Sequence, residues 1–175
     1  MGIFKDALTT QSDIWMHLGL LHGLACDPDI KHIFEIGVRT GLSTAALCAS
    51  KKTVTSVDIG PCEPDATVMR VAYPNWTFVQ EHSLKVELPD NGYSIDMLFI
   101  DGEHTYRAVS AELEKYAPNV SKWIVLHDTE TFAHKGKDGS ADGLMDAIQE
   151  FILPGTWRVM LHLRHNNGLT ILERA

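Results

Sequence analysis

The chain has 175 residues, of which 45% are hydrophobic and 22% are charged, a composition typical of globular proteins that excludes an intrinsically disordered chain. Its formal net charge of -8 argues against nucleic acid and against an anionic membrane surface as partners. Because no stretch approaches the roughly 20 apolar residues of a membrane span, and the chain does not start like a secretory signal, we expect one cytoplasmic domain over residues 1–175.

Helical and strand periods alternate along the chain. Residues 12–25 place apolar side chains at helical spacing, with Ser12 as a candidate N-cap, and we expect residues 1–30 to form a helical N-terminal segment. The pattern then predicts strands at 32–37, 53–60, 76–80, 95–100 and 122–128, and helices at 42–50, 63–72, 104–117 and 141–152. Two consecutive strands, 156–163 and 168–174, end the chain and are joined by a tight hairpin turn across Asn166, Asn167 and Gly168.

The helix expected at 104–117 is amphipathic. Val109, Leu113 and Tyr116 fall on one apolar stripe, and the same pattern places the charged side chains on its other faces, namely Glu112, Glu114 and Lys115. The order of the whole chain predicts the fold class, because nearly continuous apolar strands that alternate with helices form a parallel sheet covered on both faces. We expect an α/β, doubly wound, Rossmann-like sheet of seven strands, mostly parallel, with an antiparallel C-terminal hairpin. In such a sheet, ligands bind beyond the carboxyl ends of the strands.

A glycine-bearing turn follows the first strand, in the segment "EIGVRTG" from Glu35 to Gly41. Such a turn lets the backbone approach a ligand and directs free N–H groups at it, although a simple tight turn is the alternative. Asp58 ends the second strand, where an acid accepts hydrogen bonds from ribose hydroxyls in nucleoside-binding sheets. Arg39 stands where the dinucleotide fingerprint needs glycine, and the acid Glu35 favours a cofactor that carries an ammonium group.

The segment "EIGVRTG" resembles the first motif, E-x-G-x-x-x-G, of the class I S-adenosylmethionine-dependent methyltransferases, and the two-strand tail resembles their antiparallel seventh strand. The resemblance covers the chain from about residue 30 to its end. It implies that Glu35, Gly37 and Gly41 hold the methionine portion of the cofactor and that Asp58 binds its ribose. It also places the segment 81–83, with Ser83, beside the adenine.

Ionisable side chains gather at the ends of the fourth and fifth strands. Asp101 follows one strand and the pair His127 and Asp128 ends the next, so neighbouring parallel strands deliver carboxylates and imidazoles to one edge of the sheet. Such oxygen and nitrogen ligands suit Mg²⁺, Mn²⁺ or a related divalent cation. The alternatives are that Asp101 is the N-cap of the following helix and that Asp128 is only a turn residue.

His104 lies three residues beyond Asp101, within reach of a substrate held at the same edge. An imidazole can take a proton at neutral pH from a hydroxyl group whose pKa a divalent cation has lowered. The segments "IDGEHTY" and "VLHDT" resemble the methyltransferase branch of cephalosporin hydroxylase, the macrolide sugar O-methyltransferases and the catechol type. That resemblance implies that Asp101 and Asp128 are metal ligands and that His104 is the general base. His127, where relatives often have an acid, is a third candidate ligand that would favour a softer metal than Mg²⁺.

These residues predict an S-adenosylmethionine-dependent O-methyltransferase, assisted by a divalent metal such as Mg or Mn, that acts on a small hydroxylated acceptor. An NAD-dependent oxidoreductase, a non-catalytic cofactor-binding module and a metal-free methyltransferase remain as alternatives. The polar segment 129–143 is interpreted as a substrate lid, with plain disorder as the alternative. Because only about thirty residues precede the first strand, the acceptor pocket is expected to be shallow or to be completed by a second subunit in a homo-oligomer.

Overall fold

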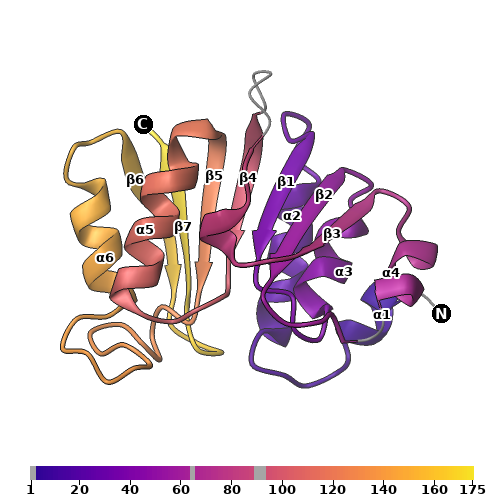
Figure 1. Ribbon diagram of the computed structural model, residues 1–175, viewed down its shortest axis with the longest axis horizontal. Helices are drawn as coiled ribbons and strands as arrows, with labels where there is room; N and C mark the ends of the chain where they lie inside the picture. Colours follow the sequence, from indigo (N-terminus) through magenta and orange to yellow (C-terminus); the bar gives the residue numbers. More distant parts are fainter. Residues whose placement is uncertain (1–2, 64–65, 89–93) are drawn as a thin grey trace.

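One seven-stranded sheet organises the protein in a computed structural model that describes residues 3–63, 66–88 and 94–175 (Figure 1). Its strands are β1 (His32–Ile36), β2 (Thr53–Asp58), β3 (Trp76–Gln80), β4 (Ile95–Ile100), β5 (Val120–His127), β6 (Trp157–Leu163) and β7 (Leu169–Arg174). They lie in the order β3-β2-β1-β4-β5-β7-β6. The strands β1 to β5 are parallel, and β7 runs antiparallel to both β5 and β6. The predicted fold class, with its C-terminal hairpin, is confirmed.

Helices cover both faces of this sheet. One core joins the sheet to α1 (Ile3–Ala7), α2 (Leu18–Ala25), α3 (Leu42–Cys48) and α4 (Ala66–Ala72). The other joins it to α5 (Tyr106–Tyr116) and α6 (Leu144–Ile152), which lie side by side (Figure 1). Three short 3-10 helices complete the described chain, η1 (Trp15–His17), η2 (Ser83–Lys85) and η3 (Ala117–Asn119). No helix within the described ranges is both long enough and apolar enough to cross a bilayer.

The chain changes direction between β1 and β4. From β1 it winds outward through β2 to β3, then returns to β4 on the other side of β1 and continues to β5. At such a switch point the loops that follow the two neighbouring strands leave in opposite directions, and a crevice opens between them. The topology therefore places the candidate site at the carboxyl ends of β1 and β4.

The N-terminal segment differs from the expected helix over 12–25. A 3-10 turn precedes α2, whose N-cap is His17, so Ser12 is not the N-cap. The backbone is held instead by the hairpin residue Asn166, whose side chain accepts from Met16 N at 2.9 Å and donates to Ser12 O at 3.0 Å. A long-range contact has overridden the local helical pattern. The helix predicted at 63–72 appears as α4, and residues 64–65 of that prediction lie outside the described residues.

Two details of α5 correct the sequence-based interpretation. The helix begins at Tyr106, and the side chain of its N-cap Thr105 accepts from Ala108 N at 3.2 Å. The alternative that Asp101 caps this helix is therefore wrong. Glu112, which we expected on a polar face, is only 3% exposed and lies on the buried side of the helix.

Candidate active site

The carboxyl ends of four strands open into one cavity of about 960 Å³. Gly37, Asp58, Asp101 and Asp128, which stand at the ends of β1, β2, β4 and β5, all line it. This volume lies within the usual range for sites that bind small molecules. The convergence of strand ends expected from the sequence is thus present in the structure.

Gly37 permits the ends of β1 and β4 to touch. Its φ is +91°, and a Cβ at this position would lie 2.1 Å from the carbonyl oxygen of Asp101. Backbone hydrogen bonds hold both residues of this contact in place. Gly37 N donates to Val57 O at 2.9 Å, and Asp101 N donates to Ile36 O at 2.8 Å. Only glycine fits this close approach with a positive φ. The cofactor turn and the acidic end of β4 are therefore one packed unit.

Asp58 shapes the turn that follows β1. Its Oδ2 accepts from Val38 N at 2.7 Å and Arg39 N at 3.0 Å, and its Oδ1 accepts from Gly60 N at 2.8 Å. A carboxylate offers about four lone-pair positions, so at least one remains for a ligand hydroxyl in the cavity. Ser83 also lines the cavity, so two of the residues predicted to contact the nucleoside face the same space.

Glu35 and Gly41 are not among the residues that line the cavity. Glu35 is fully buried, and its carboxylate accepts hydroxyl hydrogen bonds from Ser43 and Thr44 at 2.7 Å and from Ser56 at 2.5 Å. Side chains alternate along a strand, so Glu35 points towards α3. Direct contact of Glu35 with the methionine ammonium group, which we expected, does not fit this position. Gly41, with φ +71°, is the N-cap of α3.

The burial of Glu35 predicts a specific pH dependence of stability. Desolvation raises the pKa of Glu35 to about 7, although the hydroxyls of Ser56, Ser43 and Thr44 oppose the shift. Between pH 4.5, the ordinary pKa of the group, and about pH 7, Glu35 keeps a proton in the folded protein that it releases in the unfolded chain. This contribution to stability is complete below pH 4.5 and is lost as the pH rises through 7. From pH 4.5 to pH 8, the free energy of unfolding of the wild type should thus fall by about 3 kcal/mol more than that of Glu35→Gln.

Urea unfolding of both proteins across this range measures the difference. Other buried acids titrate in the two proteins alike, so they cancel in the comparison. A difference that stays constant with pH would show that folding does not raise the pKa of Glu35.

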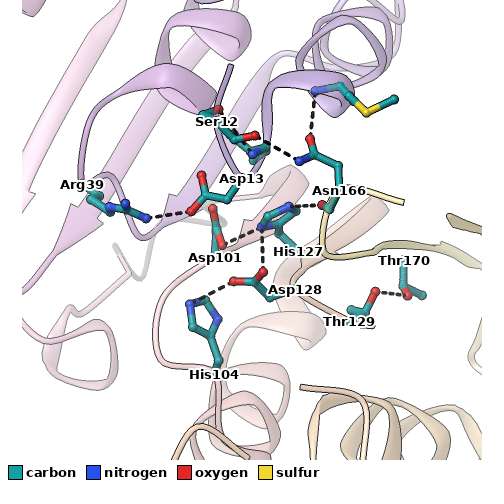
Figure 2. A network of polar contacts seen from close by, with 12 residues as sticks. Ser12, Asp13, Arg39, Asp101, His104, His127, Asp128, Thr129, Asn166 and Thr170 are labelled. Carbon is teal, nitrogen blue, oxygen red and sulfur yellow. Dashed lines mark hydrogen bonds and ion pairs between the residues drawn. The ribbon is translucent and has the colours of Figure 1, made fainter. Parts of the chain in front are cut away.

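Three ionisable side chains meet at the ends of β4 and β5 (Figure 2). Asp101, His104 and Asp128 each offer a ligand atom, and these atoms lie within 4.8 Å of one another. His104 Nε2 lies 3.1 Å from Asp128 Oδ2. Asp128 Oδ1 is buried without a hydrogen-bond partner among the described residues, and it lies 3.7 Å from His127 Nδ1. The two carboxylates of this group offer oxygen ligands that fit a divalent cation.

The backbone at Asp128 adopts a left-handed conformation, with φ +60°. Aspartate tolerates this region better than most residues, but such positions still carry strain and are concentrated at functional sites. Burial raises the pKa of Asp128, while the imidazoles of His127 and His104 oppose the shift. The interpretation of Asp128 as only a turn residue does not explain its buried carboxylate in the cavity wall.

His127 contacts both carboxylates of this group (Figure 2). Its Nδ1 contacts Asp101 Oδ1 at 3.1 Å and its Nε2 contacts Asn166 O at 3.2 Å. Both partners are acceptors, so an imidazolium that donates from both nitrogens satisfies both contacts. Burial opposes that charge, but the hydrogen bond to Asp101 and the charges of Asp101 and Asp128 outweigh it and raise the pKa of His127. With both nitrogens engaged, His127 does not fit the predicted role of metal ligand, and it orients Asp101 instead.

The segment 129–143 forms a wall of the cavity. The ring of Phe132 stacks on His104 with their centroids 5.1 Å apart and an interplanar angle of 2°. The segment is pinned to the site because Lys137 N donates to His104 O at 2.8 Å and Leu144 N donates to Phe132 O at 2.8 Å. Both Phe132 and Lys137 line the cavity, and so does Asp13 of the N-terminal segment. The alternative of plain disorder is wrong, because the segment has a defined path against the site.

Sequence reasoning missed Glu112, which lines the cavity from α5. Its signal was present, because 112 lies three residues after Val109 and four before Tyr116, which is the spacing of the apolar stripe. It also missed Phe132, for which the sequence carries no signal, because a loop residue has no periodicity that indicates its neighbours.

Comparison with known proteins agrees with this geometry. The family described as "Methyltransferase domain" matches residues 34–129, more than half of the chain. None of the curated proteins compared with the chain matches it. The fold resembles that of a 1,6-didemethyltoxoflavin-N1-methyltransferase from Burkholderia thailandensis solved with S-adenosylhomocysteine, at TM-score 0.71 and 12% identity over 98% of this chain and 82% of the other.

Two O-methyltransferases have the same fold. TomG from Streptomyces achromogenes, solved with S-adenosylmethionine, matches at TM-score 0.66 and 14% identity over 99% of this chain and 89% of the other. An enzyme from Bacillus cereus, solved with S-adenosylhomocysteine, matches at TM-score 0.65 and 14% identity over 99% and 90%. The family match gives no support to the alternative of an NAD-dependent oxidoreductase. The chain therefore belongs to the methyltransferase domain family and is a class I S-adenosylmethionine-dependent methyltransferase.

Proposed function

We propose that this methyltransferase transfers a methyl group to a hydroxyl oxygen of a small acceptor with the help of a divalent cation. The observation that carries the proposal is the group formed by Asp101, His104 and Asp128 on the wall of the cavity that Gly37 and Asp58 also line. The similarity of this fold to those of two solved O-methyltransferases supports oxygen as the acceptor atom. The N1-methyltransferase among the similar structures shows that the fold by itself does not select the acceptor atom.

The residues present fit the cofactor. Gly37 lines the cavity with backbone that carries no side chain, and the carboxylate of Asp58 can accept a further hydrogen bond from the ribose. Ser83 lies where the base is expected. When bound there, S-adenosylmethionine supplies the methyl group on its sulfonium. These residues fix the position of the nucleoside, and fixed orientation of two reactants supplies a large share of the rate in such transfers.

On the acceptor side of the cavity, the chain's own residues have two roles, to bind the cation and to take the hydroxyl proton. When bound by Asp101 and Asp128, a divalent cation supplies positive charge that lowers the pKa of an acceptor hydroxyl. Asp128 holds the His104 ring, so a neutral ring that donates from Nε2 keeps its lone pair on Nδ1. We assign Nδ1 of His104 as the atom that takes the hydroxyl proton. Phe132 stacks on the same ring and limits its rotation.

Removal of divalent cations tests the metal role directly. We expect turnover on the hydroxyl compounds of a panel of catechols, sugars, hydroxy acids and amines to fall at least tenfold in EDTA and to return when Mg²⁺ or Mn²⁺ is added in excess. A bound cation lowers the pKa of the acceptor hydroxyl, and EDTA removes that effect. The affinity for S-adenosylhomocysteine, measured by calorimetry, should not change with EDTA.

The two arms of this experiment separate the parts of the proposal. Turnover that is insensitive to EDTA would leave a metal-free O-methyltransferase, with Asp128 serving only to position His104. Turnover confined to amine acceptors would contradict the assignment of a hydroxyl oxygen.

A further inference from the structure

Glu112 carries a buried carboxylate at the cavity that the proposed reaction does not use. Glu112 reaches the cavity from α5, and its side chain is almost entirely buried. Its Oε1 accepts from Ser83 Oγ at 2.7 Å. Its Oε2 is buried and has no hydrogen-bond partner among the residues that the structure describes.

This arrangement is costly unless a ligand completes it. A buried carboxylate oxygen without a donor loses its hydration and gains nothing in exchange. Burial and the charge of Glu103 raise the pKa of Glu112 to about 7, although the hydrogen bond from Ser83 opposes the shift. Val109 and Leu113 occupy the same buried side of α5, where an apolar side chain in place of Glu112 would pack without this penalty.

The position of Glu112 identifies the part of the cofactor that it meets. Asp58, the ribose-binding candidate, ends β2, and the segment 81–84 that follows β3 contributes the adjoining cavity wall. Glu112 is tied to this wall through Ser83 and lies behind Gly102, whose Cβ position is 3.9 Å from Glu112 Oε1. The base of a nucleoside extends beyond its ribose, so Glu112 lies at the base end of the cavity.

We propose that Glu112 selects the base of the cofactor, with Oε2 accepting a hydrogen bond from the exocyclic amino group of adenine. An oxygen that lacks a donor is satisfied by an N–H group, and the amino group is the donor that distinguishes adenine from hypoxanthine. The inference depends on S-adenosylmethionine as cofactor and is independent of the metal and of the acceptor.

The variant Glu112→Gln tests this assignment by reversing the hydrogen-bonding character at one atom. Ser83 Oγ continues to donate to Oε1, so the amide nitrogen takes the place of Oε2 and presents a donor to the base. A donor opposes the amino group of adenine and suits the carbonyl oxygen of hypoxanthine. We expect the ratio of the affinities for S-adenosylhomocysteine and S-inosylhomocysteine, measured by calorimetry, to fall at least tenfold in this variant.

Glu114→Gln is the matched control, because Glu114 is exposed on the same helix and does not line the cavity. It should leave the ratio unchanged. An unchanged ratio in a folded Glu112→Gln would overturn the proposal, because a purely structural carboxylate would change both affinities together. If Glu112→Gln does not fold, the wild type decides, since equal affinity for the two ligands would also overturn it. A wild-type protein that binds neither ligand would instead contradict S-adenosylmethionine dependence.

Discussion

Asp101→Asn should lower methyl transfer by about a hundredfold or more while it leaves the affinity for S-adenosylhomocysteine nearly unchanged. The substitution keeps the shape of the side chain but removes one of the two carboxylate charges in the group with His104 and Asp128. A bound cation contributes several kcal/mol of charge stabilisation, and each 1.36 kcal/mol corresponds to a tenfold change in rate. The affinity for Mn²⁺, measured by calorimetry, should fall together with the rate.

The control for this variant is Asp142→Asn, since Asp142 is an exposed acid outside the cavity wall. It changes the net charge by the same amount and should not alter metal affinity or rate. An Asp101→Asn protein that binds Mn²⁺ as the wild type does would contradict the role of Asp101 as ligand. A loss of cofactor affinity equal to the loss of rate would mean that Asp101 supports the cofactor turn rather than the cation.

The sequence predicted which strand ends carry the site but not which side chains face it. Asp58, Asp101 and Asp128 end their strands, and the carboxyl ends of parallel strands share an edge, so their convergence follows from the fold class alone. The face of Glu35 does not follow, because β1 is buried on both sides and its apolar pattern contains no alternation. A motif position alone therefore did not show that Glu35 points under α3.

Contacts between distant segments account for the rest of what the sequence did not indicate. Asn166 holds the backbone of residues 12–16 and also accepts from His127, so one hairpin residue displaces the expected helix start and completes the contacts of a side chain expected to bind metal. Neither contact leaves a local pattern. Glu112 is different, because helical spacing alone places it among the buried residues, and only its charge suggested otherwise.

The contact between Gly37 and Asp101 predicts that Gly37→Ala will damage stability and both halves of the site at once. The new Cβ would lie 2.1 Å from a backbone oxygen that cannot move without displacing the end of β4, and alanine is also strained at φ +91°. We expect the free energy of unfolding in urea to fall by about 3 kcal/mol or more. The affinity for S-adenosylhomocysteine should fall because the cofactor turn at Gly37 is distorted. The affinity for Mn²⁺ should fall as well, because the displaced carbonyl and the carboxylate expected to bind the cation both belong to Asp101.

Gly139→Ala separates strain from collision in this prediction. Gly139 has φ +84°, close to that of Gly37, but no atom lies within 4 Å of its Cβ position. It should therefore show the backbone penalty alone, about 1 kcal/mol, with cofactor and metal affinities unchanged. If the two variants lost equal stability, the collision with Asp101 would contribute nothing to the stability loss of Gly37→Ala. If Gly37→Ala lost cofactor affinity but kept metal affinity, the turn after β1 and the end of β4 would be independent, and the cofactor and the cation would not be positioned by one packed unit.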